Sequence, residues 1–334
     1  MVGRLLIAGG AGFMGCNFVR YLLRTYDDVG VVVYDKLTYA GRLENLHDVQ
    51  GDKRFRFVRG DICDEGVFGK VVKDNEPDVV VNFAAETHVD RSINEPAPFL
   101  RTNVFGAFVV FEVCRKFDVP LVVHISTDEV YGDLGDGGSA DEGYPFRPSS
   151  PYSVSKASGD LLAQAYYRTY GVPVIVVRPS NNFGPYQHPE KFIPKIIIRA
   201  MYDMPVPVYG DGGQVRDWLF VEDFCEALNL IVNKGVSGEV YNVPGFNERR
   251  NVEVVTAILG LMGKSRSLVR FVEDRPSHDR RYSMVGDKVC SLGWRPRTGW
   301  LDGLRKTVEW YLGNKWWWRP LVGDDYFVKD VPWR

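Results

Sequence analysis

The first half of the chain alternates short apolar runs with longer segments whose apolar positions recur at helical spacing. The runs consist mostly of consecutive Val, Ile and Leu residues, with little alternation between apolar and polar positions. Strands of this kind are buried on both faces, as in a parallel sheet with helices on each side. The pattern therefore predicts an α/β fold, a doubly wound parallel Rossmann-type sheet with strands within residues 4–10, 31–35, 55–61, 78–85, 120–127 and 172–181.

The pattern changes after about residue 181. Pro and Gly divide the chain into shorter elements, for example in residues 205–218 and 274–282, as expected of a smaller domain with many loops. We predict a large domain over residues 1–180 and a smaller C-terminal α/β domain over 181–334. Residues 223–232 have helical spacing that suits the first domain, so part of 215–245 is expected to return to it.

The composition is that of an ordinary globular protein. The chain is 45% hydrophobic and 25% charged with a formal net charge of −2, which gives no electrostatic reason to expect a nucleic-acid partner. The apolar runs are too short for a signal-peptide core or a membrane span, so we expect no secretion and no membrane. Five scattered cysteines, in no metal-binding spacing, predict reduced thiols, no metal and a cytoplasmic location.

The first predicted strand leads into GGAGFMG, which places Gly9, Gly12 and Gly15 three residues apart. Glycines between a strand and a helix let a pyrophosphate approach the backbone N–H groups, because no Cβ intervenes. Alone, the motif would equally fit a plain glycine turn. Asp35 ends the next strand, where a carboxylate accepts hydrogen bonds from ribose hydroxyls and repels a 2′-phosphate. Together these residues predict a dinucleotide site that prefers NAD to NADP.

A second motif, PYSVSK, follows the fifth predicted strand. Tyr152 and Lys156 are four residues apart, so on a helix they share one face. A lysine ammonium near a phenol favours the phenolate, and the positive nicotinamide of NAD would help, so Tyr152 could act as a base near neutral pH. An isolated Tyr and Lys at this spacing more often belong to an ordinary amphipathic helix, but the dinucleotide motif favours catalysis.

Three polar residues, Thr127, Asp128 and Glu129, follow the apolar strand that precedes this helix. A strand end with a polar turn and a helix cap is the simpler explanation of such a stretch. Successive side chains of a regular strand point to opposite faces. If both carboxylates serve one site, the chain is therefore expected to leave strand geometry at Asp128.

In combination, these motifs resemble the extended short-chain dehydrogenase/reductase family, in its nucleotide-sugar branch. Six stretches are similar to the dTDP-glucose 4,6-dehydratases of that family, over essentially the full length: DKLTYAG (35–41), AAETHVDRSI (84–93), STDEVYG (126–132), NNFGPYQHPEK (181–191), VRDWLFVEDF (215–224) and DRPSHDRRY (274–282). The resemblance implies a lyase with catalytic NAD. Such an enzyme converts dTDP-glucose to dTDP-4-keto-6-deoxy-glucose plus water, for deoxysugar biosynthesis such as that of rhamnose.

The resemblance also implies roles for the polar residues. Tyr152, with Lys156, removes the proton of the sugar 4-hydroxyl while hydride passes from C4 to NAD, and Thr127 hydrogen-bonds that hydroxyl. Glu129 then acts as base at C5 and Asp128 as acid toward the departing C6 hydroxyl, because loss of water needs one of each. Two nearby carboxylates disfavour double ionisation, which raises one pKa, and either residue could hold the proton.

The matching motifs imply two sets of binding residues. Lys191 and Arg216 are expected on the diphosphate as charge-assisted donors. The cofactor set is Gly9, Gly12, Phe13, Met14, Gly15, Asp35, Lys36, Leu37, Thr38, Asp61, Ile62, Ala84, Ala85, Glu86, Thr87, Thr102, Tyr152, Lys156 and Asn182. The substrate set is His88, Thr127, Asn181, Lys191, Phe192, Pro207, Val208, Tyr209, Arg216, Asn251, Asp274, Arg275 and His278.

This chain departs from the family pattern at a few positions. Family members mostly have Gly where this chain has Ser277, and the added Cβ falls in a loop where Gly would permit a left-handed conformation. Thr87 stands where Ser is usual, which keeps the hydroxyl. The C-terminal stretch Trp316 to Trp318 is expected to pack the last helix on its domain rather than to bind sugar.

Three alternatives stay open. UDP-glucose 4,6-dehydratases need the same carboxylates, and only the DRPSH loop favours dTDP. UDP-sugar 4-epimerases and decarboxylases keep the Tyr and Lys but lack the Asp-Glu pair. A non-catalytic NAD sensor would need the glycines but no acid–base set.

A homodimer is a further implication of the resemblance. Two helices of each subunit would pack into a four-helix bundle, the one that carries Tyr152 and the one that follows TNVFGAF (102–108). The apolar residues Leu161, Leu162 and Ala165 suit such an interface.

Overall fold

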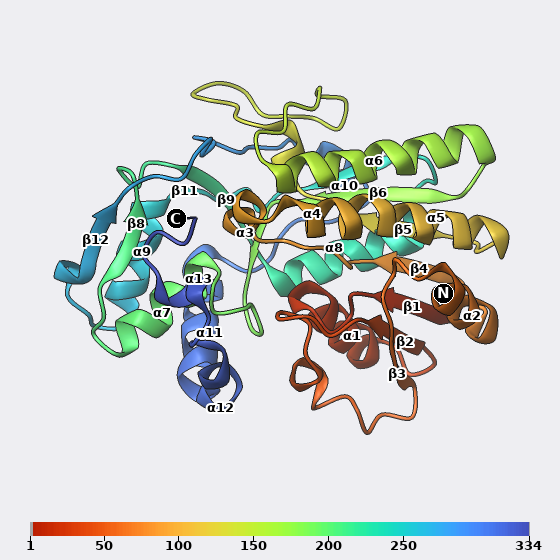
Figure 1. Ribbon diagram of the computed structural model, residues 1–334, viewed down its shortest axis with the longest axis horizontal. Helices are drawn as coiled ribbons and strands as arrows, with labels where there is room; N and C mark the ends of the chain where they lie inside the picture. The colour runs from red at the N-terminus through yellow and green to blue at the C-terminus, as the bar shows by residue number, and fades with distance from the viewer. Residues whose placement is uncertain (1–2, 334) are drawn as a thin grey trace.

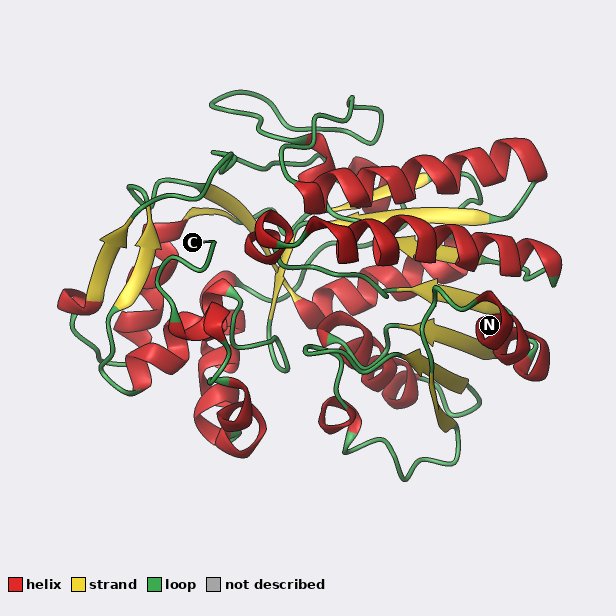
Figure 2. Cartoon of the chain, viewed as in Figure 1, coloured by secondary structure: helices red, strands yellow, loops and turns green. Residues whose placement is uncertain are grey.

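The computed structural model describes residues 3–333, which build one large parallel sheet and two small ones (Figures 1 and 2). The large sheet has the strand order β10-β6-β5-β4-β1-β2-β3, and all its pairs are parallel. Its strands are β1 (Arg4–Ala8), β2 (Gly30–Asp35), β3 (Phe55–Arg59), β4 (Val79–Asn82), β5 (Val122–Ile125), β6 (Val174–Pro179) and β10 (Val240–Val243). The predicted doubly wound Rossmann-type sheet is thus confirmed.

Helices cover both faces of this sheet. On one face α1 (Phe13–Thr25) packs against α8 (Val221–Lys234); on the other, α5 (Ala107–Lys116) packs against α2 (Glu65–Asn75) and α6 (Pro151–Tyr170). Alternate residues of each strand supply the two cores: Ile7 and Val81 belong to the first, Leu6 and Val80 to the second. Burial on both faces explains why these strands are continuous apolar runs.

The C-terminal part forms a separate group of elements, seen at the left of Figure 1. A three-stranded sheet has the order β11-β9-β7, and β12 pairs with β8. Its elements are β7 (Asn181–Phe183), α7 (Phe192–Met201), β8 (Val206–Tyr209), β9 (Val215–Phe220), β11 (Glu248–Arg250), α9 (Asn251–Leu261), β12 (Val269–Val272) and α11 (Trp300–Gly313). Between β9 and β11 the chain returns to the large sheet through α8 and β10.

Short helices complete the fold. They are η1 (Leu43–Leu46), α3 (Val89–Asn94), α4 (Pro96–Phe99), the π-helical η2 (Leu100–Gly106), η3 (Asp128–Tyr131), η4 (Arg266–Leu268), α10 (Asp287–Ser291), α12 (Lys315–Trp318), η5 (Arg319–Leu321) and α13 (Asp325–Val328). Trp317 and Trp318 of α12 are 1% and 0% exposed, which confirms their predicted packing role. Trp316 is different, because half of its surface is exposed.

One long helix was not singled out in the sequence analysis. The elements α4, η2 and α5 run on as a single helix, Pro96–Lys116, which by length and composition could cross a membrane. Half of its most apolar stretch is buried inside the fold, as is also usual for a core helix. Counting uninterrupted apolar residues did not single this helix out, because polar residues such as Arg101 and Asn103 divide it.

Candidate active site

The turn from β1 into α1 needs its glycines because other backbone lies very close. Gly9 has φ of +74°, and a Cβ on it would lie 2.5 Å from the Ala84 backbone nitrogen. A Cβ on Gly15 would lie 2.5 Å from the carbonyl oxygen of Gly9. Gly12 caps the first turn of α1 with extended backbone. The turn therefore leaves the start of α1 open to a phosphate, as the motif predicts.

Two carboxylates stand at the ends of the next strands. Asp35 is buried and accepts the backbone N–H groups of Ala11 at 2.9 Å and Leu37 at 2.8 Å. Asp61 accepts the N–H of Cys63 at 3.0 Å and forms a 2.7 Å ion pair with Lys36. Asp35 thus keeps the glycine loop and the loop after β2 in a fixed relation.

The polar stretch after β5 leaves strand geometry where expected. Thr127 is still extended, at φ −160° and ψ 155°, and the helical turn η3 begins at Asp128. The Thr127 hydroxyl donates to Asp128 Oδ1 at 3.1 Å and accepts the N–H of Glu129 at 3.3 Å. In a turn of this kind successive side chains need not point to opposite faces. Asp128 and Glu129 accordingly line the same cavity.

The two carboxylates differ in their electrostatic surroundings. Burial, and then the charge of Glu129, raise the pKa of Asp128 well above its usual range. Burial also raises the pKa of Glu129, but the cations Arg275 and Arg216 oppose that rise. Since the two acids interact, they titrate as a coupled pair. The environment favours a proton on Asp128 and a negative charge on Glu129.

Tyr152 and Lys156 reach the cavity from α6, whose start is fixed by a capping box at Ser150 and Ser153. The Lys156 ammonium donates to the carbonyl oxygen of Ile125 at 2.6 Å, and burial lowers its pKa to about 8. Burial and the charge of Glu129 raise the pKa of Tyr152. In the protein alone these effects favour the neutral phenol, and the influence of Lys156 on Tyr152 stays a prediction.

A cavity of about 280 Å³ lies at the carboxyl ends of the strands and extends from the glycine loop to the carboxylate pair. This is the usual place for a ligand in a doubly wound sheet. The predicted residues that line it are Gly9, Gly12, Phe13, Met14, Gly15, Asp35, Lys36, Thr38, Asp61, Ile62, Ala84, Ala85, Glu86, Thr87, Thr102, Thr127, Asp128, Glu129, Tyr152, Lys156, Asn181, Asn182 and Lys191.

Several lining residues were missed by the sequence analysis. They are Tyr34, Ala40, Gly41, Gly60, Phe83, Ile125, Ser126, Pro179, Ser180, Tyr186, Gln187 and His188. Five of them are adjacent to predicted residues, and six fall inside quoted motifs, namely DKLTYAG, STDEVYG and NNFGPYQHPEK. A search that included every residue of the matching stretches would have found those six.

The other predicted residues do not line this cavity: Leu37, His88, Phe192, Pro207, Val208, Tyr209, Arg216, Asn251, Asp274, Arg275 and His278. Two of these residues direct their side chains to the hydrophobic core. The Val208 side chain is fully buried there, so the predicted ligand contact of this residue would come from its backbone. The Leu37 side chain packs against the same core, and its contribution is the N–H group held by Asp35.

The remaining substrate residues are occupied by contacts within the protein. His88 is buried and caps α3, and burial lowers its pKa to about 4, so its ring is neutral. Phe192 stacks on Trp218 with ring centroids 6.1 Å apart. Asn251 begins α9 and donates its backbone N–H to Gln214.

Three charged or aromatic groups form a connected set beside the cavity, and Arg216 makes a separate contact. Arg275 pairs with Asp90 at 3.0 Å, and Tyr209 donates to the same carboxylate at 3.0 Å. Arg216 donates to the carbonyl oxygen of Asp279 at 3.0 Å. Arg275 and Arg216 both act electrostatically on Glu129. This set therefore adjoins the carboxylate pair.

The loop that carries Arg275 holds a strained residue. Ser277 has φ of +52°, the left-handed conformation that favours Gly. His278 Nδ1 lies 2.6 Å from Asp274 Oδ1, and burial, followed by the charge of Arg275, lowers the pKa of His278. The neutral ring therefore donates its Nδ1 hydrogen to Asp274.

Buried acceptors along the cavity have no partner among residues 3–333. They are Ser126 Oγ, Asp128 Oδ2, Asn181 Oδ1, Asn182 Oδ1 and Gln187 Oε1. Buried polar atoms are nearly always hydrogen-bonded, so this set indicates a polar ligand. Within the same described range, no group of His, Cys, Asp and Glu could hold a metal ion.

The fold and the site together define a dinucleotide-binding enzyme of the short-chain dehydrogenase/reductase type. The family model described as GDP-mannose 4,6 dehydratase matches residues 6–307, and the chain belongs to this family. The prediction made from the motifs is thereby confirmed at the level of the family.

Individual relatives are more specific. The chain is 47% identical to a probable dTDP-glucose 4,6-dehydratase of Sinorhizobium fredii, with 95% of each chain covered. It is also 47% identical to the dTDP-glucose 4,6-dehydratase of Neisseria meningitidis, with 98% of each covered. These relatives confirm the resemblance to dTDP-glucose 4,6-dehydratases.

Solved structures of a dehydratase and of a related epimerase have the same fold as this chain. The dTDP-glucose 4,6-dehydratase of Streptomyces venezuelae, with NAD and TYD bound, matches with a TM-score of 0.92 and 47% identity, covering 95% of this chain and 99% of that one. A UDP-glucose 4-epimerase of Thermus thermophilus, in complex with NAD, matches with a TM-score of 0.86 and 31% identity, covering 93% and 99%.

Proposed function

We propose that the protein is a dTDP-glucose 4,6-dehydratase, an NAD-dependent hydro-lyase that converts dTDP-glucose to dTDP-4-keto-6-deoxy-glucose and water. The observation that carries the proposal is the turn η3, which presents Asp128 and Glu129 to one cavity beside Tyr152. Loss of water from neighbouring carbons requires a base and an acid within reach of one sugar. A 4-epimerase or a cofactor sensor would not need the carboxylate pair Asp128 and Glu129.

The acid and base roles follow the electrostatic difference between the two carboxylates. Asp128, whose pKa is the more strongly raised, holds the proton that the departing C6 hydroxyl needs. Glu129, near Arg275 and Arg216, stays negative and removes the proton at C5. The proton on C5 becomes acidic only once C4 is a ketone, so this step follows the oxidation. After water leaves, a proton returns to C5.

The cofactor site fits NAD on its own geometry. Gly9 and Gly15 leave the space that a pyrophosphate needs, and Asp35 stands at the end of β2 where an adenosine ribose would bind. When bound, NAD accepts hydride from C4, returns hydride to C6 and places a positive ring near the site. That charge offsets the burial and the carboxylate field that keep Tyr152 neutral. Tyr152 then takes the proton of the 4-hydroxyl, with Lys156 nearby.

The substrate's diphosphate and nucleoside would extend from the carboxylates toward the C-terminal elements. Lys191 lines the cavity, and its ammonium donates to the carbonyl oxygen of Thr87 at 2.7 Å. Arg275 Nε is buried and has no hydrogen-bond partner among the described residues. With Arg216, these cations supply donors for phosphate oxygens. Tyr209, Asp274 and His278 adjoin Arg275 and would contact the nucleoside.

The division of the chain supports this arrangement. The large sheet, with α8 and β10 added from later sequence, would bind NAD, and the elements from residue 181 onward would bind the nucleotide sugar. The product would serve deoxysugar biosynthesis, such as that of rhamnose. All five cysteines are free thiols, which suits a cytoplasmic enzyme.

A homodimer accounts for exposed apolar residues on two adjacent helices. Leu100 and Phe105 of η2, and Val154 and Leu161 of α6, are 43–56% exposed although large and apolar. The helix Pro96–Lys116 and α6 pack side by side at one face of the molecule (Figure 1). The same pair from a second copy would complete a four-helix bundle. Leu161→Glu should therefore yield monomers by light scattering, and an unchanged mass would contradict the dimer.

One experiment tests the function directly. Purified protein is incubated with dTDP-glucose, and separately with UDP-glucose, in deuterated water without added reductant, and the sugar product is analysed by NMR. We expect a 4-keto-6-deoxy sugar with deuterium at C5, formed from dTDP-glucose in preference to UDP-glucose.

Each other outcome has a distinct meaning. A C4 epimer without loss of water would contradict the roles of Asp128 and Glu129 and favour the epimerase alternative. Equal turnover of both nucleotides would contradict only the preference for dTDP. Binding of NAD without any product from either sugar would favour a sensor.

A further inference from the structure

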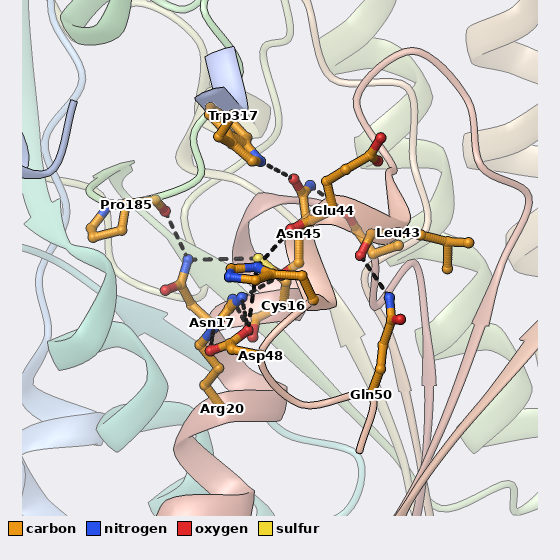
Figure 3. Close-up of polar contacts among 12 residues, drawn as sticks. Cys16, Asn17, Arg20, Leu43, Glu44, Asn45, Asp48, Gln50, Pro185 and Trp317 are labelled. Carbon is orange, nitrogen blue, oxygen red and sulfur yellow. Dashed lines mark hydrogen bonds and ion pairs between the residues drawn. The ribbon is translucent and has the colours of Figure 1, made fainter. Parts of the chain in front are cut away.

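One buried asparagine, Asn45, joins helix α12 to the glycine loop, and Figure 3 shows its contact with Trp317. Asn45 lies in η1 and is 1% exposed. Its Nδ2 donates to the carbonyl oxygens of Ala11 at 2.7 Å and Ala40 at 3.3 Å. Its Oδ1 accepts the indole N–H of Trp317 at 2.7 Å. Ala11 lies 34 residues before Asn45 in the sequence, and Trp317 lies 272 residues after it. The single amide of Asn45 thus joins two distant segments of the chain.

The partners of Asn45 determine which way its amide points. An indole N–H can only donate, and a backbone carbonyl can only accept. A flipped amide would place its oxygen against the Ala11 and Ala40 carbonyls and its N–H groups against Trp317. The indole of Trp317 therefore selects the orientation in which Asn45 supports the glycine loop. Without that N–H, the buried Oδ1 would lose its partner.

Ala11 is held from both sides by this arrangement. Its N–H donates to Asp35, and its carbonyl oxygen accepts Asn45 Nδ2 and the backbone N–H of Arg42, the latter at 3.1 Å. The Arg42 guanidinium in turn donates to the carbonyl oxygen of Trp317 at 3.1 Å. Two chains of hydrogen bonds, one through Asn45 and one through Arg42, therefore connect Trp317 with Ala11 of the glycine loop.

We propose that Trp317 and Asn45 are positioning residues that hold the glycine loop in its NAD-binding shape and thereby slow the release of NAD. The inference rests on the proposed function, in which NAD is regenerated in every turnover and has to stay bound through many of them. A loop whose N–H groups are fixed in advance loses less conformational freedom on binding, which strengthens binding. Neither side chain is among the residues that line the cavity.

The neighbouring tryptophan offers a matched control. Trp318 is 0% exposed, and its indole N–H donates to the carbonyl oxygen of Tyr311 at 2.8 Å, away from Asn45. Trp317→Phe and Trp318→Phe each remove one buried indole N–H from the same short helix and keep an aromatic ring. In the first variant the ring still packs near Tyr186, which lines the cavity.

The test measures release of NAD from the purified holoprotein by exchange with isotopically labelled NAD. Trp317→Phe should release NAD at least about tenfold faster than the wild type, since a buried acceptor is left unpaired. Trp318→Phe should release NAD at the wild-type rate. At saturating NAD both variants should keep the wild-type kcat, and their NAD-free forms should melt at equal temperatures.

A second variant breaks the same connection at its other end. Asn45→Asp keeps an oxygen for the Trp317 indole and removes the N–H donors to Ala11 and Ala40. It should also release NAD faster, and Trp317→Phe should add little in that background, because both changes act on one contact. If Trp317→Phe does not fold, Asn45→Asp against the wild type decides the matter.

Failure of the inference and failure of the proposed function look different. Equal release rates from the two tryptophan variants, or wild-type release from Asn45→Asp, would overturn the positioning role while the wild type still binds NAD. A wild type that neither contains nor binds NAD would overturn the proposed function as well.

Discussion

The two ends of the active site differ in the groups that form them: backbone groups at the cofactor end and charged side chains at the nucleotide-sugar end. At the cofactor end, backbone shape dominates: glycines leave space, and Asp35 and Asn45 fix the loop through backbone N–H and carbonyl groups. At the nucleotide-sugar end, charged side chains dominate, and Arg275 and Lys191 already have partners within the protein. The cofactor end therefore has its loop fixed in advance, whereas in the proposed function the other end would exchange internal contacts for ligand contacts.

The largest expected effect lies where the two ends meet. Tyr152→Phe removes the group that takes the 4-hydroxyl proton, so kcat should fall by about 10²–10⁴-fold. Single-turnover absorbance of reduced NAD at 340 nm should show no oxidation of the sugar. Tyr166→Phe is the control, because Tyr166 lies in the same helix and its hydroxyl donates to Glu112; loss of oxidation in that variant too would contradict a specific role for Tyr152.

Asp128→Asn should separate loss of water from the first oxidation. Water loss should slow by about 10²-fold, while reduced NAD still forms and C5 still exchanges with deuterium. Asp128 must be protonated to act as the acid, and its raised pKa keeps the proton to higher pH than in an ordinary aspartic acid. Above that pKa the wild-type rate should fall, and this limb should be absent from the variant's pH profile. A variant that fails to reduce NAD would refute the assignment.

Gly15→Ala tests the backbone character of the cofactor end. The added Cβ would lie 2.5 Å from the carbonyl oxygen of Gly9, so the loop must shift, and the Kd for NAD should rise by about 10–100-fold. Gly260→Ala is the control, because a Cβ there meets nothing within 4 Å. Calorimetric titration of NAD into the NAD-free protein gives both values, and equal affinities would mean that the loop adapts freely.

Arg275→Gln tests the side-chain character of the other end. Removal of a charge-assisted donor should raise KM for dTDP-glucose by about 10–100-fold and leave NAD affinity unchanged. Arg280→Gln, in the same loop but paired on the surface with Asp211, should keep the wild-type KM. Should both variants show the same KM, Arg275 would have no special role toward substrate.

The smallest expected effect concerns the strained loop. Ser277→Gly should relieve the left-handed conformation and raise the free energy of unfolding by up to about 1 kcal/mol, measured by urea denaturation. Ser291→Gly, at the end of α10, should lower it instead, by roughly 0.5 kcal/mol. A loss of stability in Ser277→Gly would show that the loop does not strain the chain.

Local patterns predicted much of this molecule. Continuous apolar runs predicted the parallel sheet, because a strand that is buried on both faces needs apolar residues at successive positions. The glycine loop was predictable for a similar reason, since its backbone conformation limits the residues allowed. The turn at Asp128 was predictable only from the expected chemistry, because two successive carboxylates can serve one site only outside a regular strand. The pKa of Tyr152 was not predictable, because it depends on burial and on the carboxylates that the fold brings near the phenol. The contact between Asn45 and Trp317 was beyond any local pattern, as no short motif joins them.

That contact has a consequence for how the protein is made. A ribosome that adds about 5–20 residues per second needs roughly 15–55 s to pass from Asn45 to Trp317, 272 residues later. During this interval the glycine loop already exists, but Asn45 still lacks the indole that orients it. Cofactor met by the growing chain would encounter a loop with incomplete support. Firm capture of NAD therefore belongs to the period after residue 317 has left the ribosome.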